Sequence, residues 1–225
     1  MAVNRAREEW KIEHGVFDQF TLRVIEKLRG QGHFEELTQA LALGKEANVF
    51  IAHADPDVIV KVYRLENRDF KKMLEYLVQD PRYAHVKRRK REIVFAWAQR
   101  EYRNLLIARE AIPVPKPMAY HKNVLVLDMI GPPAEQLKDA PPKDPEEFYA
   151  IIIKYIKLLR NQGLVHGDLS EFNILNHDEH PIFIDFSQAS PVDAPNAREL
   201  FDRDVKNIIR SAQKHGVTLS VTDFE

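Results

Sequence analysis

The sequence LVHGDLSEFNIL, residues 164–175, brings a histidine, a carboxylate and an amide close together between apolar residues. Asp168 and Asn173 are five positions apart. This spacing is typical of a phosphotransferase catalytic loop, in which the carboxylate accepts or orients the proton of the acceptor hydroxyl and the amide coordinates magnesium. Asp185, in the later sequence IFIDF, provides a second carboxylate that can reach the same metal. We interpret His166 as a structural hydrogen-bonding residue rather than a base.

Asp168 and Asp185 also have simple explanations when each is taken alone, since one could cap a turn and the other could end a strand. The ordered set of carboxylate, amide and second carboxylate makes those explanations less favourable. Magnesium prefers hard oxygen ligands and keeps several waters, so a carboxylate, an amide and nucleotide phosphates form a sensible coordination shell. The set therefore predicts ATP with Mg²⁺ as the cofactor, and leaves the choice between Mg²⁺ and Mn²⁺ open.

A phosphotransferase also needs a cation at the nucleotide phosphates, and Lys61 in the strand-like sequence VIVKVYR is the candidate. A lysine that faces inward on a strand is costly unless it is paired. We expect its partner to be Glu101, on the helix that contains AQREYRNL, whereas Glu92 and Glu110 lie nearer the helix ends. Taken alone, Lys61 could instead extend to solvent from an edge strand.

The sequence LGKEANVF lies where a glycine-rich loop would cover the phosphates, but it has one glycine and does not match GxGxxG. Its lysine and backbone amides could still reach phosphate oxygens. The candidate residues of this loop are Gly44, Lys45, Glu46, Ala47, Asn48 and Val49. Adenine would pair with backbone groups of the connector Asp128, Met129 and Ile130.

These residues must be positioned by helices and strands that the hydrophobic pattern also predicts. Alternating residues over 47–65 predict two antiparallel strands joined at 55–57, with Val58, Val60 and Val62 on one face and Lys61 on the other. Residues 79–93 lose all periodicity and predict a mobile basic loop. Further expected elements are helices over 17–29, 70–77, 93–110, 145–161 and 198–214, a hairpin over 118–131 turning near 122–123, a proline-rich crossing over 131–145 and a short strand over 181–186.

Composition limits the remaining functions. The chain has 33 basic and 34 acidic residues, so no global field favours nucleic acid or an anionic membrane. Cysteine is absent, which excludes disulfides, thiolate zinc sites and cysteine nucleophiles. The start of the sequence is charged and no long apolar window follows, so we expect neither a signal peptide nor a membrane span. These features predict a soluble, cytoplasmic protein.

The motifs LVHGDLSEFNIL, IFIDFSQAS and LGKEANVF resemble the catalytic loop, metal-binding segment and phosphate loop of the RIO kinases. The likeness is strongest to the type-one branch, in a compact archaeal form. VFDQFTL, FAWAQREYRNL and RDVKNIIR support it, and together the motifs span residues 16–217.

The resemblance implies an α+β, bilobal, protein-kinase-like fold with an antiparallel sheet and helices in the N-lobe. It also implies a reduced helical C-lobe without the activation segment and the peptide-docking helices, which fits the forty residues after Asp185. We expect an N-terminal helical extension over 1–36, an N-lobe over 37–130 and a C-lobe over 131–225.

The resemblance also implies roles for single residues. Asp168 would accept the proton, Asn173 and Asp185 would bind the metal, and Asp185 would also accept the phosphoryl group as an aspartyl-phosphate. The residues assigned to ATP are Lys61 and Glu101 as an ion pair, and Asp128 and Ile130 through backbone groups. The implied function is an ATP-dependent serine/threonine protein kinase or ATPase in maturation of the small ribosomal subunit, with the precursor subunit as partner.

Two other functions, and three roles for a basic run, are also compatible with the sequence. The motif HGDL…N followed by IDF also occurs in aminoglycoside and choline kinases, which carry a larger helical lobe after the metal-binding aspartate. A nucleotide-binding scaffold with little turnover is another alternative, although such proteins usually lack one of the residues that are present here. The basic run Lys87, Arg88, Arg89, Lys90 and Arg91 is either a solvated loop, a contact to ribosomal RNA phosphates or a nuclear import signal.

Overall fold

The structure is a computed structural model that describes residues 17–66, 69–83 and 85–225. It divides into two compact units, each described by itself below. Unit 1 comprises the residues up to Glu75, Val86–Tyr102 and Pro117–Met129, and unit 2 comprises Tyr76–His85, Arg103–Lys116 and Ile130–Glu225. Two segments of the expected N-lobe over 37–130, Tyr76–His85 and Arg103–Lys116, therefore belong to unit 2. Residues 1–16 of the expected N-terminal extension lie outside the described residues.

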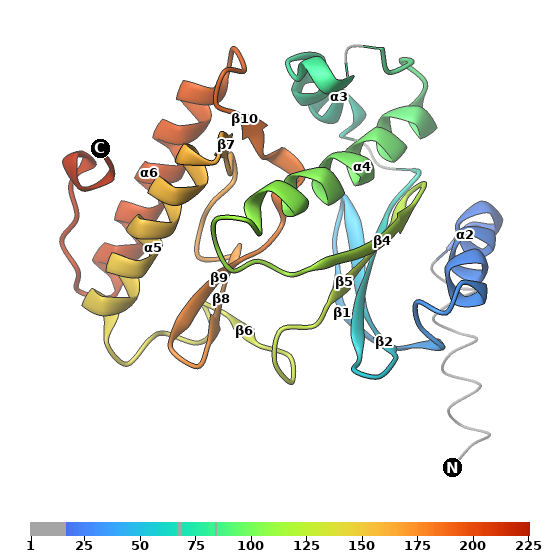
Figure 1. The fold of residues 1–225 in the computed structure, drawn as a ribbon, viewed down its shortest axis with the longest axis horizontal. Coiled ribbons are helices and arrows are strands. Elements are labelled where there is room, and N and C mark those ends of the chain that lie inside the picture. The colour runs from blue at the N-terminus through green and yellow to red at the C-terminus, as the bar shows by residue number, and fades with distance from the viewer. Residues whose placement is uncertain (1–16, 67–68, 84) are drawn as a thin grey trace. The chain divides into compact units, whose positions relative to one another are not determined.

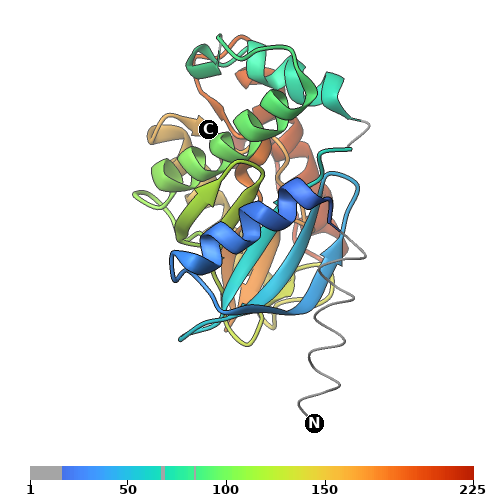
Figure 2. The same ribbon diagram turned by 90° about the vertical axis from the view of Figure 1, so that its right-hand side faces the viewer.

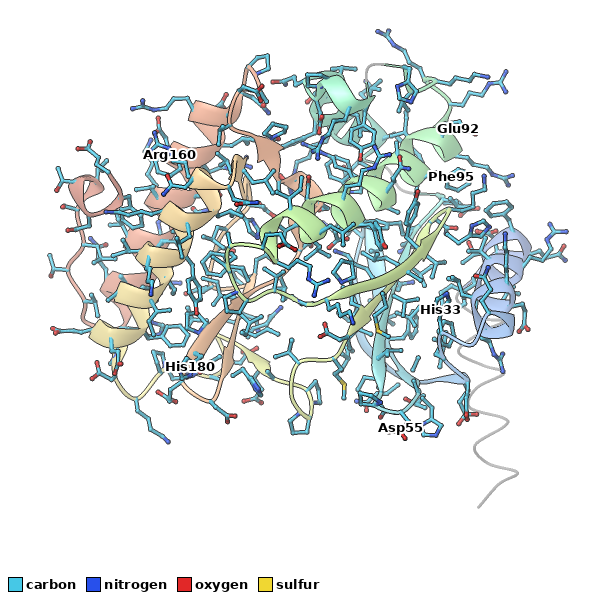
Figure 3. All side chains as sticks on the ribbon, viewed as in Figure 1. His33, Asp55, Glu92, Phe95, Arg160 and His180 are labelled. Atoms are coloured by element: carbon cyan, nitrogen blue, oxygen red, sulfur yellow. The ribbon has the colours of Figure 1, made fainter. Side chains whose placement is uncertain are left out.

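Unit 1 contains a five-stranded antiparallel sheet in the order β1-β2-β3-β5-β4 (Figure 1). The strands are β1 (Glu36–Leu43), β2 (Ala47–His53), β3 (Val58–Tyr63), β4 (Pro117–His121) and β5 (Val124–Asp128). The predicted turns are confirmed, because β2 and β3 join through a turn that includes Asp55 (Figure 3), and Lys122 lies at the tip between β4 and β5 with a φ of 54°.

One face of this sheet forms a hydrophobic core with helix α2 (Gln19–Gly30), which crosses the sheet in Figure 2. The helix begins at Asp18, whose side chain accepts hydrogen bonds from the backbone N–H groups of Phe20 and Thr21. The buried side chains of the core include Val24, Ile25, Leu28, Val58, Val60 and Val62. The predicted alternation along β3 is therefore confirmed, and it turns Lys61 to the opposite face.

Helix α3 (Phe70–Val78) lies where it was predicted, but the expected basic loop over 79–93 is wrong in its extent. A short 3-10 helix spans Pro81–Tyr83, and α4 (Lys90–Ala108) begins three residues before the expected start. Its first basic side chains pack on aromatic rings, with Lys90 Nζ 5.3 Å from the Phe70 ring centre and the Arg91 guanidinium 5.2 Å from that of Phe20. These contacts stabilise a helix start that the local sequence does not indicate.

Unit 2 is built around helices α5 (Pro145–Asn161) and α6 (Ala197–Lys214). The predicted start of α5 is confirmed, because the Asp144 side chain accepts a hydrogen bond from the Glu147 N–H at 3.0 Å. A three-stranded sheet contains β6 (Glu135–Gln136), β8 (Ile174–His177) and β9 (His180–Phe183), and a two-stranded one contains β7 (Leu164–Val165) and β10 (Ser190–Pro191). Strand β6 lies inside the segment predicted as a simple crossing.

Among the described helices, none combines the length and apolar character needed to cross a membrane.

Candidate active site

The predicted ion pair between Lys61 and Glu101 is present in unit 1. The Lys61 Nζ lies 2.9 Å from Glu101 Oε1, and both side chains are almost fully buried. The Tyr63 hydroxyl donates to Glu101 Oε2, and the Tyr63 ring centre lies 5.2 Å from Lys61 Nζ. A strand residue and a helix residue forty positions apart thus hold the ammonium group in one place. Glu92, the alternative partner, lies in the first turn of α4 (Figure 3).

The predicted phosphate loop is a tight hairpin between β1 and β2. The Gly44 N–H donates to the Ala47 carbonyl at 3.0 Å, and a Cβ on Gly44 would lie 2.7 Å from that carbonyl oxygen, so the turn requires glycine. Lys45 is exposed, whereas the Glu46 carbonyl accepts from the Arg64 N–H at 2.9 Å. Strand register places Val49 opposite Lys61. The end of the hairpin and the ammonium group therefore lie on neighbouring strands of the same sheet.

The expected adenine connector begins at the end of β5. Asp128 is the last residue of that strand and pairs with Val58, and Met129 and Ile130 follow it. The Ile130 carbonyl accepts a hydrogen bond from the Ala134 N–H at 2.7 Å. The Ile130 N–H and the second lone pair of this carbonyl are the backbone groups that a contact to adenine would use. Whether these residues bind adenine stays a prediction.

The predicted catalytic loop, in unit 2, is held by backbone contacts around His166. His166 is buried, its Nε2 lies 3.0 Å from the Ile184 carbonyl, and its Nδ1 lies 3.4 Å from the Asp168 N–H. A carbonyl only accepts and an N–H only donates, so the ring donates from Nε2 and accepts at Nδ1. Gly167 has a φ of 78°, and a Cβ there would lie 2.8 Å from the Gln188 carbonyl oxygen. This arrangement fits the structural role expected for His166.

Asp168, Asn173 and Asp185 lie on connected backbone. Asn173 Nδ2 donates to the Asp168 carbonyl at 2.8 Å and lies 3.4 Å from Asp168 Oδ2. The Asn173 carbonyl accepts from the Ile184 N–H at 3.0 Å, which extends the β8–β9 pairing by one step. Asp185, the next residue, therefore comes to the same end of the hairpin as Asn173. Because Asn173 Nδ2 faces the Asp168 carbonyl, the Asn173 Oδ1 atom faces away from that carbonyl.

Asp204 on α6 supports the backbone of the predicted catalytic loop, a role that was not predicted from the sequence. It is 2% exposed and accepts hydrogen bonds from the N–H groups of Gly167 at 2.7 Å and Leu169 at 2.8 Å. Burial raises the pKa of Asp204 to about 7, although these two hydrogen bonds and the Arg203 guanidinium oppose the rise. Both N–H groups flank Asp168, so Asp204 fixes the backbone on either side of the proposed base.

Arg203, beside it, holds the same loop. Its guanidinium donates to the Gly167 carbonyl, and to the Tyr76 hydroxyl at 3.0 Å. The signal for Asp204 was visible, because Leu200, Asp204 and Ile208 are spaced by four along α6 and all are buried. A carboxylate inside an apolar helical stripe indicates a buried hydrogen-bonding role.

The residues present fit a magnesium ion. Asn173 and Asp185 offer an amide and a carboxylate oxygen, both hard donors of the kind that Mg²⁺ prefers. Within residues 17–66, 69–83 and 85–225, no group of three or more histidine, cysteine or carboxylate side chains is arranged to hold a metal. A metal bound here would thus take its remaining ligands from phosphate and water, as is usual for nucleotide-bound Mg²⁺.

A model described as the RIO domain matches residues 48–224. That range includes all the predicted catalytic and metal-binding residues, and all of the predicted nucleotide-binding residues from Asn48 onward.

Curated relatives are similar over most of the chain. The RIO-type serine/threonine-protein kinase Rio1 of Methanocaldococcus jannaschii is 41% identical over 222 residues, which cover 96% of this chain and 77% of that protein. The Rio1 kinase of Haloferax volcanii is 39% identical over 215 residues, covering 93% of this chain and 74% of that protein. The human serine/threonine-protein kinase RIO1 is 33% identical over 215 residues, covering 91% of this chain and 38% of that protein.

Solved structures show the same fold. The Rio2 kinase from Chaetomium thermophilum aligns with a TM-score of 0.70 and 25% identity, covering 89% of this chain and 64% of that one. A structure of that kinase described as an ADP/Mg²⁺-phosphoaspartate complex aligns with a TM-score of 0.69 and 24% identity, covering 89% of this chain and 62% of that one. This chain spans less than two thirds of either. The predicted α+β kinase-like fold is confirmed.

Proposed function

Because the chain belongs to the RIO family of atypical protein kinases, in its archaeal-like Rio1 type, we propose that it is an ATP-dependent serine/threonine protein kinase or ATPase. It transfers the γ-phosphate to itself, to a protein hydroxyl or to water. The observation that carries the proposal is the hydrogen bond from Ile184 to the Asn173 carbonyl, which brings Asp185 and Asn173 to one end of a hairpin while Asn173 contacts Asp168.

In the proposed reaction, the acceptor oxygen attacks the γ-phosphorus while Asp168 accepts its proton. The bond from the γ-phosphorus to the ADP oxygen breaks, and ADP leaves. Asn173 and Asp185 would hold Mg²⁺, which would supply charge neutralisation at the phosphate oxygens. Lys61, fixed by Glu101, binds the other phosphates of ATP, and the hairpin Gly44–Val49 covers them. Asp128, Met129 and Ile130 contact adenine.

Asp185 has a second role in the proposal, as a phosphoryl acceptor. A carboxylate oxygen forms the new bond to the γ-phosphorus as the bond to ADP breaks, and water later displaces the carboxylate and releases inorganic phosphate. The Rio2 complex of C. thermophilum is described as containing ADP, Mg²⁺ and phosphoaspartate. We extend that chemistry to this chain as part of the proposal.

The proposal also includes a partner and a location. We propose that the enzyme acts in the cytoplasm on the precursor of the small ribosomal subunit. The basic residues Lys87, Arg88 and Arg89 are exposed and would contact ribosomal RNA phosphates. Because the net charge is −1, such a contact would depend on this local basic segment, and contacts to phosphates do not read the RNA sequence.

The fate of labelled γ-phosphate tests the function. The protein would be incubated with γ-labelled ATP and Mg²⁺, and the label would be separated into acyl phosphate, hydroxyl ester and free phosphate. We expect free phosphate together with a hydroxylamine-sensitive acyl phosphate, and we expect the acyl phosphate to be absent in Asp185→Asn. Label that stays entirely in ATP would refute the proposed activity. Free phosphate or hydroxyl ester alone would refute only the aspartyl-phosphate.

A further inference from the structure

A buried polar network holds the segment that follows Asp185. Asn104, on α4, is fully buried, and its Nδ2 donates to the carbonyl oxygens of Phe186 at 3.0 Å and Ala189 at 2.7 Å. Phe186 is the residue directly after Asp185, and the two carbonyls bracket the 3-10 helix Phe186–Gln188. A side-chain amide has two N–H donors, so both are used on this one turn.

Arg82 and Asp80 fix the orientation of the Asn104 amide. Arg82 Nη2 donates to Asn104 Oδ1 at 2.8 Å, and because a guanidinium can only donate, the amide oxygen must face it. Arg82 in turn pairs with the buried Asp80 through Nε at 2.9 Å and Nη2 at 2.7 Å. This bidentate contact with Asp80 restricts the orientation of the guanidinium.

The network matters because Asp185 itself has an unusual backbone conformation. Its φ is 62°, in the left-handed region that costs energy for residues other than glycine. Such a conformation persists only when the residues on both sides are held. On the preceding side, Ile184 donates to the Asn173 carbonyl, and on the following side Asn104 holds Phe186.

From these contacts we infer that Asn104, oriented by Arg82 and Asp80, is a positioning residue that sets the carboxylate of Asp185 for metal binding. The inference rests on the proposed function for the identity of the metal site. It adds Asn104, Arg82 and Asp80 to the residues assigned to the metal and ATP, and none of the three was assigned a role from the sequence.

Asn104→Asp separates positioning from simple packing. The substitution keeps the size of the side chain and keeps an acceptor for Arg82, but it replaces both N–H donors with an oxygen that faces two carbonyls. Arg82→Lys is a second variant. It keeps a positive charge near Asp80, but an ammonium group cannot reproduce the bidentate contact with Asp80 together with the hydrogen bond to Asn104. Arg198→Gln is the matched control, since Arg198 pairs with Asp202 on the exposed surface of α6.

Two measurements that do not depend on turnover test the inference. Electron paramagnetic resonance would follow Mn²⁺ binding in the presence of ADP, and hydrogen–deuterium exchange would follow the amides of residues 184–189. We expect Asn104→Asp to weaken Mn²⁺ binding by about 10- to 100-fold, the range typical for partners that orient a metal ligand. Exchange over residues 184–189 should be faster in the same variant. Arg82→Lys should shift both readouts in the same direction by less, and Arg198→Gln should change neither.

The outcomes separate the two claims. If the wild-type protein does not bind Mn²⁺ with ADP, the proposed metal site fails, whatever the variants do. If the wild type binds and a folded Asn104→Asp binds equally well, the positioning role of Asn104 is wrong. If Asn104→Asp does not fold, Arg82→Lys decides, and unchanged Mn²⁺ binding in that variant would overturn the inference.

Discussion

At the residue scale, the proposed site depends on two carboxylates, Asp168 and Asp204, that differ in their exposure to solvent. Asp168 is half-buried and is proposed to take a proton, whereas Asp204 is buried and holds the backbone on both sides of Asp168. Burial raises the pKa of Asp204 to about 7, so its charge changes near neutral pH. A carboxylate that holds the loop backbone can therefore make the activity depend on pH.

We predict that phosphoryl transfer falls as the pH drops below about 7. Ionised Asp204 accepts from the N–H groups of both Gly167 and Leu169, but the protonated form presents an O–H to one of these donors. Single-turnover rates at saturating ATP and Mg²⁺, measured across this pH range, would show the fall. In Asp204→Asn the rate should be low throughout, and this fall should disappear. A variant with the wild-type pH profile would contradict the role of Asp204.

The same group should affect stability in the opposite direction. The pKa of Asp204 is raised from 3.8 to about 7 by burial, so between these values the folded protein holds a proton that the unfolded chain has lost. Its contribution to the free energy of unfolding is therefore complete below about pH 4, and it falls by at most about 1.4 kcal/mol per pH unit as the pH rises to about 7. Urea unfolding of wild type and Asp204→Asn would test this. Equal pH slopes in both proteins would exclude it.

The residues differ in how far the sequence could predict them. The pairing of Lys61 with Glu101 could be predicted, because a lysine on a strand and a glutamate on a helix each carry a recognisable local pattern. The partners of Asp204 and Asn104 could not be predicted, because they are backbone groups more than thirty positions away. Almost every residue offers the same backbone N–H and C=O groups, so the sequence does not indicate which of them a buried side chain will contact. That information comes from the fold.

At the scale of elements, strand β3 and helix α4 must hold the Lys61–Glu101 pair. The pair is nearly inaccessible to water, so removing one of its charges breaks a buried ion pair, which is strongly destabilising. The sheet therefore depends on a contact that is also proposed to position ATP.

We expect Glu101→Gln to lower the free energy of unfolding by about 3 kcal/mol, the cost typical of breaking a buried pair. Its amide group would also face the Tyr63 hydroxyl, which now donates to Glu101. The control is Glu92→Gln, in the first turn of the same helix (Figure 3), which should change stability by less than about 0.5 kcal/mol. Urea unfolding measures both, and similar small effects in the two variants would argue against the structural importance of the pair.

Local signals predicted some element boundaries and not others. The start of α5 follows from Asp144 and Pro145, because capping and the proline at the first helical position are local effects. The start of α4 could not be predicted, because Lys90 and Arg91 gain their support from Phe70 and Phe20. Contacts between residues distant in sequence override weak local preference there.

At the scale of the whole molecule, charge is nearly balanced, with a formal net charge of −1. Binding to RNA would therefore depend on a local basic surface rather than on the field of the entire chain. The exposed residues Lys87, Arg88 and Arg89 form such a surface in the segment before α4.

We predict that single-stranded RNA binding weakens steeply with salt and weakens equally for different sequences. Replacing Lys87, Arg88 and Arg89 by alanine should reduce the slope of log affinity against log salt by about 2, because about 0.7 counterions are released per phosphate contact. Lys90 and Arg91 are kept in this variant, since they pack on aromatic rings. Filter binding at several salt concentrations would measure the slope, and an unchanged slope would assign the contact elsewhere.

Asp168 is proposed to accept a proton during phosphoryl transfer, and Asp168→Asn removes the carboxylate that would accept it. The measurement is the single-turnover loss of γ-phosphate from labelled ATP with Mg²⁺, at protein concentrations that saturate ATP binding in both wild type and variant. We predict that the variant binds ATP with similar affinity and loses γ-phosphate about 10²- to 10⁴-fold more slowly, the range typical of a positioned acid or base. A variant that binds ATP and loses γ-phosphate at the wild-type rate would show that Asp168 is not the proton acceptor.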